Sequence, residues 1–553
     1  MLRKLLVVGV CVGLGATVLK AQDGLIKKYY QDVQVAKVEV GPLRNVGRWV
    51  DGTLYISERQ AIELALENNY DLNVERHNRL IRQWDITLDR SAYDSTGRFG
   101  LNWNRAKTPS ASVLSGGPSV TDIVTDYTFG FEKPFSTGSS FELNFEGIRN
   151  RTTNFFSSLV PAINTQFELL FHQKLLAGFL KSDAEYDLEI GRNNLELNSA
   201  QFRATVINVV SQVQESFWEL DYALRDIDVK QKSLELAQTT YEQNQARLEV
   251  GTASRLEVVQ AEAEVASRRE ELIGSQSTYR LAQDRLIKLI TSLDDPRKFS
   301  GRLVPDQTDR TLPPTEPYGQ LVEAAISSRP EIRQSDLTIS NREVELTRSR
   351  DKLKPSLDFV AGYQQFGLGG TKVERDFSQG FINPPILDII PGGLGDALSQ
   401  TFSGDYYGYV LGLNLQFPLN NTEARARNAQ AQIQLNQAKM QRGSIEQTIG
   451  TEIRNTLTLI EGNRARVEAS LTAVRAARER LDGEQARFDV GMGTTRDLIE
   501  AQRDLLVAES VALRARIDLI ENYNSLDQVV GRTLQRHNIT LSDVEDQNVV
   551  RPN

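Results

Sequence analysis

Gln245-Ala246-Arg247-Leu248-Glu249-Val250-Gly251 is the stretch that decides the fold, because the chain contains it twice. The motif returns 240 positions later as Gln485-Ala486-Arg487-Phe488-Asp489-Val490-Gly491. The same spacing relates Leu286 to Leu526, so the repeat extends beyond these seven residues. Although 553 residues could make three or four domains, the duplication predicts one elongated body folded from two similar halves.

A long helical pattern leads into each copy of the motif. Between 182 and 250, and again between 422 and 490, no proline interrupts a narrow apolar seam with steps of three and four residues. At about 1.5 Å per residue, each span reaches about 100 Å. Such rods pack side by side as in coiled coils, so they need neighbours from the other half or from other chains. Shorter helices are expected over 58–92 and 321–352.

Alternation of apolar and polar residues predicts strands before each long helix. The exposed-face candidates are strongly aromatic, and the opposite face carries Glu and Asn. A soluble sandwich would also alternate, but a short turn at 136–139 and long loops at 107–122, 150–165 and 367–404 favour an outer-membrane barrel with a wet interior. The apolar positions are Phe99, Leu101, Trp103, Tyr127, Phe129, Phe131, Phe141, Leu143, Phe145, Phe167, Leu169, Phe171, Leu357, Phe359, Ala361, Tyr363, Tyr407, Tyr409, Leu411, Leu413, Leu415 and Phe417.

The N-terminus has the features of a secretory signal peptide over 1–21: Arg3 and Lys4, an apolar run, and the small residue Ala21. Its removal would also remove Cys11, the only cysteine, which excludes disulfides, zinc–cysteine sites and thiol catalysis in the mature chain. The net charge of -9 then becomes -12, because three basic residues leave with the signal. An acidic chain without a basic cluster argues against nucleic acid as a partner.

An enzymatic function is not expected. Only His77, His172 and His537 are available, in different elements, and we find no glycine-rich phosphate loop or metal-ligand spacing. No cofactor is therefore predicted. The competing hypothesis is a periplasmic or envelope coiled-coil protein that acts as a structural tether without channel activity. It explains the long helices but leaves the aromatic strands without a purpose.

Taken together, these features resemble the TolC family of outer-membrane channels over nearly the whole mature chain, from 57 to 531. The most specific similarities are the duplicated Val-Gly turns, the strand exit Leu415-Gln416-Phe417-Pro418-Leu419, and Lys354-Pro355 before a strand. The resemblance implies an α+β fold in which membrane β-barrel strands and very long coiled-coil-like helices form a trimeric barrel-tunnel, with two structural repeats per chain.

In function, the resemblance implies the passive exit duct of a tripartite efflux or type I secretion system. The homotrimer would sit in outer-membrane lipid with a periplasmic extension, and it would meet a periplasmic adaptor protein and an inner-membrane transporter. Drug efflux, metal efflux and protein secretion share this outer component, so the cargo stays open at this stage.

The repeats are expected at 22–290 and 318–531, with a connector at 291–317 and a polar, loosely held tail at 532–553. The family norm is two strands in each half, whereas the first half here has four strand-like runs. Either six strands of each subunit enter the barrel, or one hairpin decorates its rim.

Two groups of residues are candidates for function by their position in the family pattern. The resemblance implies that the Val-Gly turns form the periplasmic tip that docks the adaptor: Val250, Gly251, Thr252, Ser254, Val490, Gly491, Met492 and Thr494. It also implies an acidic ring at the pore mouth, from Glu257, Asp497 and Glu500, which could equally be ordinary surface acids. Where some members hold the tip with Tyr and Arg, this chain has Phe488 and Gly493; Arg255 or Arg496 could substitute.

Overall fold

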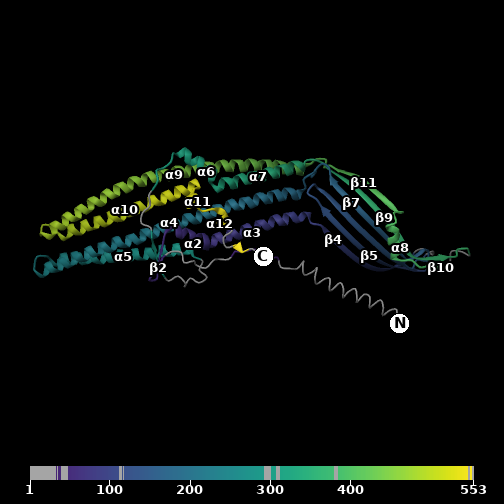
Figure 1. Cartoon of the computed structure of the whole chain (residues 1–553), viewed down its shortest axis with the longest axis horizontal. Coiled ribbons are helices and arrows are strands. Elements are labelled where there is room, and N and C mark those ends of the chain that lie inside the picture. Colours follow the sequence, from purple (N-terminus) through teal and green to yellow (C-terminus); the bar gives the residue numbers. More distant parts are fainter. Residues whose placement is uncertain are drawn as a thin grey trace, which may run out of the picture.

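The protein is elongated, with long helices at one end and a sheet at the other (Figure 1). This computed structural model describes residues 48–110, 117–291, 301–306, 312–378 and 384–545, with short pieces at 33, 35–38, 115 and 549–550. The expected signal peptide over 1–21 lies outside the described residues, as do 292–300 and 307–311 of the expected connector.

Two helices of nearly equal length confirm the duplicated rods: α4 (Asp183–Glu249) and α9 (Thr422–Asp489). Each turns back into an antiparallel partner, α5 (Arg255–Ile290) or α10 (Thr495–Val530). α4 also packs against α10, so the four helices form a single layer in the order α5, α4, α10, α9. Within the described chain, none of the helices has the length and apolarity needed to cross a bilayer.

Nearer the sheet, shorter helices complete the layer in the order α3, α4, α7, α9. The sequence predicted one helix at each of these places, and this was wrong, because both are broken. α2 (Glu58–Asn68) ends where the Asn69 side chain accepts a hydrogen bond (2.9 Å) from the Asp71 amide and starts α3 (Tyr70–Arg90). α6 (Tyr318–Ser328) ends before Pro330, which occupies the first turn of α7 (Pro330–Asp351).

Six long antiparallel strands form one sheet beyond the helices, in the order β4–β5–β6–β7–β9–β11. The four strands of the first half pair with one another in sequence, and the last of them, β7, pairs with β9 of the second half. No hairpin of the first half is therefore a separate decoration of the rim. Within the described residues, β4 and β11 each have only one long partner, and the sheet has two open edges. The strands are β4 (Thr96–Pro109), β5 (Ser119–Pro134), β6 (Ser139–Thr152), β7 (Leu159–Lys174), β9 (Ser356–Arg375) and β11 (Tyr407–Gln416), and short β10 (Ile386–Ile390) pairs with the end of β9.

The register gives the sheet two different faces. Apart from a bulge between Leu159 and Ala162, paired residues across all six strands are both odd-numbered or both even-numbered. The odd face therefore collects every aromatic and aliphatic position that the sequence predicted to be apolar in the strands. The even face carries eight carboxylates: Asp122, Asp126, Glu132, Glu142, Glu146, Glu168, Asp358 and Glu374.

The short helix α8 (Leu394–Thr401) lies on the odd face, across the outer parts of β7 and β9. Its buried Ala397 and Thr401 pack where Gly367 and Gly369 leave no side chain, and a Cβ on either glycine would collide with the helix. The Thr401 hydroxyl also lies 2.6 Å from the Thr165 hydroxyl of β7. The helix is therefore a fixed part of this face.

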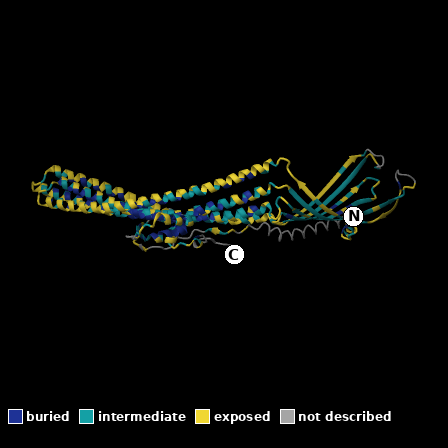
Figure 2. Cartoon of the chain, turned by 90° about the horizontal axis from the view of Figure 1, so that it is seen from above, coloured by how far each residue is buried: buried dark blue, intermediate teal, exposed yellow. Residues whose placement is uncertain are grey.

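The buried core gathers in the middle of the molecule, where the short helices meet the long ones (Figure 2). The segment after 531, expected to be loosely held, is partly buried there: Leu534 and Val544 join the core, and Arg76 donates a 3.0 Å hydrogen bond to the Val544 carbonyl. Ile539 and Leu541 pack against the same core, so a few apolar side chains hold a mostly polar tail in place. The small elements here are β1 (Lys37–Val38), β2 (Arg48–Val50), β3 (Thr53–Ile56), η1 (Ser91–Tyr93), β8 (Arg302–Pro305), α11 (Thr533–Arg536), α12 (Leu541–Glu545) and β12 (Val549–Val550).

Candidate functional site at the helical tips

Both Val-Gly turns have the same geometry, as the repeat predicts. At the end of α4, Gly251 has a φ of +77°, and its amide donates to the Leu248 carbonyl (3.0 Å) while the Thr252 amide donates to the Arg247 carbonyl (2.8 Å). The end of α9 repeats these two bonds around Gly491. This pair of bonds around a left-handed glycine is a Schellman motif, which satisfies the last carbonyls of the helix and reverses the chain sharply. Glycine is needed because of its positive φ.

The candidate docking residues lie at the far end of the molecule, away from the sheet (Figure 1). Val250 is 74% exposed, Val490 70% and Met492 75%. Ser254 and Thr494 are different in character, because each caps the helix that follows by accepting a hydrogen bond from its backbone. The turns thus present three apolar side chains outward on rigidly capped hairpins.

All three candidate pore-mouth acids have partners within their own chain. The Glu257 carboxylate completes a capping box by accepting from the Ser254 amide (2.6 Å), and Asp497 accepts from the Thr494 hydroxyl (2.7 Å). Glu500 lies 3.4 Å from Arg480 of α9. Glu257 and Asp497 therefore stabilise the starts of their helices, a role that the sequence analysis did not identify.

Polar contacts join the two hairpins just behind the turns. The Arg247 guanidinium donates to the Phe488 carbonyl (2.6 Å) and lies 3.8 Å from the centre of the buried Phe488 ring. Farther along, Thr495 donates to Asn244 (3.0 Å) and Gln502 donates to Thr240 (2.9 Å). The contact between α4 and α10 is therefore polar near the tips, whereas the middle of the molecule has an apolar seam.

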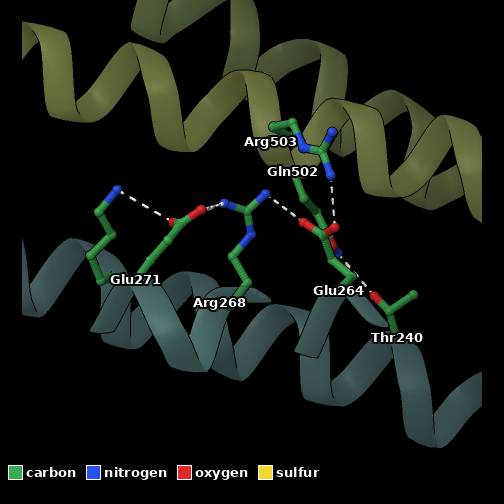
Figure 3. A network of polar contacts seen from close by, with 7 residues as sticks. Thr240, Glu264, Arg268, Glu271, Gln502 and Arg503 are labelled. Atoms are coloured by element: carbon green, nitrogen blue, oxygen red, sulfur yellow. Dashed lines mark hydrogen bonds and ion pairs between the residues drawn. The ribbon is translucent and has the colours of Figure 1, made fainter. Parts of the chain in front are cut away.

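A charged network links the hairpins farther from the turns (Figure 3). Glu264 of α5 contacts Arg268 one turn on, and Arg503 reaches across from α10 to the same carboxylate (2.8 Å). Arg268 also binds Glu271 (2.9 Å), which lies 3.5 Å from Lys230 of α4. Glu264 and Arg268 are both buried, so each needs its partner to offset the loss of water.

Sequence reasoning did not find these links. Arg247 was visible only as part of the repeat, and its counterpart Arg487 pairs instead with Glu484 of its own helix (3.1 Å). Arg255 and Arg496, the suggested substitutes for a tip lock, form no ion pair with any described residue. The signal that could have found Arg247 is its position four residues before Gly251, opposite Phe488 of the other copy.

Farther from the tips along the α4–α10 contact, a second charged cluster contains a carboxyl with a perturbed pKa. Burial of the Glu521 carboxyl raises its pKa to about 7, against the opposing effect of the Arg514 guanidinium 3.6 Å away. Arg514 is shared with Glu219 (2.6 Å) and Asp518 (2.6 Å). Across the described residues, no group of His, Cys, Asp and Glu is arranged to hold a metal ion.

Comparison with known proteins identifies the family to which this architecture belongs. A sequence profile of the outer membrane efflux protein family matches residues 179–292 and 321–532, which span both hairpins of long helices. The chain belongs to this family. The TolC resemblance is thereby confirmed, and the family is one of outer-membrane efflux channels, not of enzymes.

Relatives and solved structures match most of the chain. Outer membrane efflux protein BepC of Brucella suis biovar 1 (strain 1330) is 24% identical over 478 residues, 85% of this chain and 84% of BepC. The CmeC outer membrane channel of Campylobacter jejuni has a TM-score of 0.60 at 14% identity, covering 92% of this chain and 98% of CmeC. A membrane protein from Pseudomonas aeruginosa has a TM-score of 0.61 at 17% identity, covering 86% and 93%. These likenesses show the fold of a family member.

Proposed function

We propose that three copies of this chain form the passive exit duct of a tripartite efflux or type I secretion system. Cargo would arrive from an inner-membrane transporter through a periplasmic adaptor and leave through a barrel shared by the three subunits. The observation that carries this proposal is that both long sides of the described chain lack a partner. From the sheet to the tips, each side has an unpaired strand edge and outer helices with exposed apolar residues.

On one side lie the free edge of β4 and the outermost helices α3 and α5, and on the other lie β11 and α9. A free sheet edge leaves unpaired backbone groups, which a lipid environment cannot satisfy. Both outer helix faces also expose apolar residues, several at seven-residue spacing as in coiled coils. They are Val74, Ile81 and Leu88 on α3, Ile273 and Leu281 on α5, and Ile433, Met440, Leu459 and Leu471 on α9.

A ring of identical subunits would pair the free strand edges and cover the exposed apolar helix faces at the same time. β4 leads away from the helices and β11 leads back, so β11 of one subunit can pair antiparallel with β4 of the next. In the same arrangement, α9 meets α3 and α5 of that neighbour. A single copy cannot close its own six strands around a wide passage, because both edges already lie at opposite sides of one curved layer.

The two faces of the sheet support a lipid outside and water inside. The odd face exposes large apolar side chains, among them Phe99 (78%) and Leu411 (77%), and carries no carboxylate. Eight carboxylates lie on the even face, and burying them in hydrocarbon would be costly. The odd face therefore suits the membrane, and the even face suits the passage.

The tips fit the adaptor end of the duct. Exposed Val250, Val490 and Met492 offer apolar contacts at the end of capped hairpins, and six such hairpins would surround the mouth of a trimer. We assign Asp497 and Glu500 to the acidic ring of that mouth, with Glu257 on the neighbouring hairpin. Fixed carboxylates there would attract cations and repel anions.

Extraction and conductance test the proposal. We expect the protein to require detergent, to have the mass of three chains, and to conduct ions in planar bilayers. A protein that is soluble without detergent and never conducts would instead support an envelope tether.

A further inference from the structure

We propose that Arg105, Lys107, Arg149 and Arg151 form a binding surface for a lipid that carries two or more phosphates in the outer leaflet of the membrane. This inference rests on the proposed function, because it takes the odd face of the sheet as the lipid-facing side. We call these four residues the basic surface.

The register brings the four residues together at the end of the sheet that lies away from the helices. Arg105 of β4 pairs with Ile123 of β5, which pairs in turn with Arg151 of β6. One row nearer the helices, Thr125 of β5 pairs with Arg149. Adjacent strands are about 4.8 Å apart and alternate residues about 7 Å apart, so the array, which spans three rows from Arg149 to Lys107, measures about 10 Å by 14 Å.

The charge of the basic surface is not neutralised by the protein. All four side chains are exposed, and none forms an ion pair with a described residue. No Asp or Glu shares the odd face of the six strands, because the nearest carboxylates, Asp122 and Asp126, project from the even face. A surface that keeps four cations together without a counter-charge is suited to an external anion.

The position of the basic surface fits the boundary between hydrocarbon and headgroups. Trp103 lies one row nearer the helices than Arg105, Tyr127 lies one row nearer than Arg149, and the two end the aromatic residues of their strands. The Tyr127 ring covers Gly147, where any Cβ would collide with it, so the ring fills the space just before Arg149. Arginine or lysine costs about 2–4 kcal/mol at the bilayer midplane and about 0–1 kcal/mol near the interfaces, so four cations in one place mark an interface.

At the other end of the odd face, next to the helices, the basic residue has a protein partner. The basic residue there, Lys133, donates a 2.6 Å hydrogen bond to the Tyr93 carbonyl and thus belongs to the joint between sheet and helices. Among the described residues of the odd face, cations without a protein partner are found at the end away from the helices. That end faces the outer leaflet, because the long helices lead to the periplasm.

The chemistry of the array selects the kind of lipid. Arginine binds phosphate with two parallel hydrogen bonds, and three arginines here are fixed on two rigid strands. A zwitterionic headgroup carries its own cation and would bring that charge close to the array. A headgroup with two phosphates can instead contact β4 and β6 together, across the single strand between them.

Binding of lipid A to the purified full-length protein in detergent tests the inference. Its two phosphates supply the anion, and the same lipid without phosphates, phosphatidylcholine and inorganic phosphate are the comparison probes. The test variant replaces all four basic residues with glutamine. The matched control keeps the charge through Arg105→Lys, Arg149→Lys and Arg151→Lys.

We expect the glutamine variant to bind diphosphorylated lipid A at least tenfold more weakly than the wild type. The lysine control should bind with intermediate affinity, because lysine keeps the charge but cannot form the two parallel hydrogen bonds of an arginine. Equal binding by the wild type and the glutamine variant would overturn the inference. So would equal binding of phosphatidylcholine, or complete competition by inorganic phosphate at the same concentration.

The same preparations are recorded in planar bilayers, which separates the two proposals. If both the wild type and the glutamine variant conduct, and the two also bind lipid A with the same affinity, the proposed duct stands and only the lipid-binding surface is wrong. If the wild type is not a trimer and does not conduct, the proposed function itself fails.

Discussion

Replacing Arg247 with glutamine should loosen the tips of the proposed duct. The change removes the hydrogen bond to the Phe488 carbonyl (2.6 Å) and the stacking of the guanidinium on the Phe488 ring (3.8 Å). A hydrogen bond to a charged group contributes about 1.5–3 kcal/mol and an exposed cation–π contact about 0.5–1 kcal/mol. Arg247 is partly exposed to solvent, so a net loss of about 1 kcal/mol per subunit is a conservative figure.

Three copies in a ring would change the balance between joined and separated hairpins by about 3 kcal/mol, or about a hundredfold. The assay is single-channel recording in planar bilayers, which measures mean conductance and the fraction of time spent in the larger conductance state. Both should rise in Arg247→Gln.

The repeat supplies a matched control, because Arg487 occupies the same place in the second copy but pairs only within its own helix (3.1 Å to Glu484). Arg487→Gln should therefore leave conductance unchanged. The reasoning is refuted if the two variants behave alike, or if Arg247→Gln conducts like the wild type.

Three further predictions follow from the charges and faces described above. Asp497→Asn with Glu500→Gln should weaken the preference for cations, measured as a reversal potential across a salt gradient; an unchanged potential would remove both from the pore mouth. Burial raises the pKa of the Glu521 carboxyl from 4.5 to about 7, so its ionisation opposes folding, and the free energy of unfolding falls as pH rises through that window. Glu521→Gln should raise the melting temperature at pH 8 but not at pH 4, and equal melting curves at pH 8 would contradict this. Leu143→Lys should impair assembly in the membrane far more than Asn144→Lys, judged by the yield of trimer, because only Leu143 is on the odd face, midway along the strands; equal yields would mean that the faces are misassigned.

Much of the fold could be predicted because it is periodic. The seams of α4 and α9, the paired turns at Gly251 and Gly491, and the alternation in the strands all repeat a local rule many times. The helix breaks at Asn69 and Pro330 were missed, since one side-chain cap or one proline within a good helical pattern is a weak signal.

The polar links between the hairpins could not be predicted in the same way. Arg503 and Glu264 lie 239 residues apart, and only the packing of α10 against α4 and α5 brings them together. The asymmetry between Arg247 and Arg487 arises because the two copies of one motif meet different surroundings. The roles of Glu257 and Asp497 as caps were, by contrast, within reach, because each lies three residues after Ser or Thr at a helix start.

The number of chains and strands in the assembled ring tests the central proposal most directly. An image reconstruction of the purified protein in lipid discs is the measurement. We predict three subunits with six strands each, eighteen in one closed ring, and β4 of every subunit hydrogen-bonded to β11 of its neighbour. A single chain with both edges unpaired, or a sheet whose aromatic face turns away from the lipid, would contradict it.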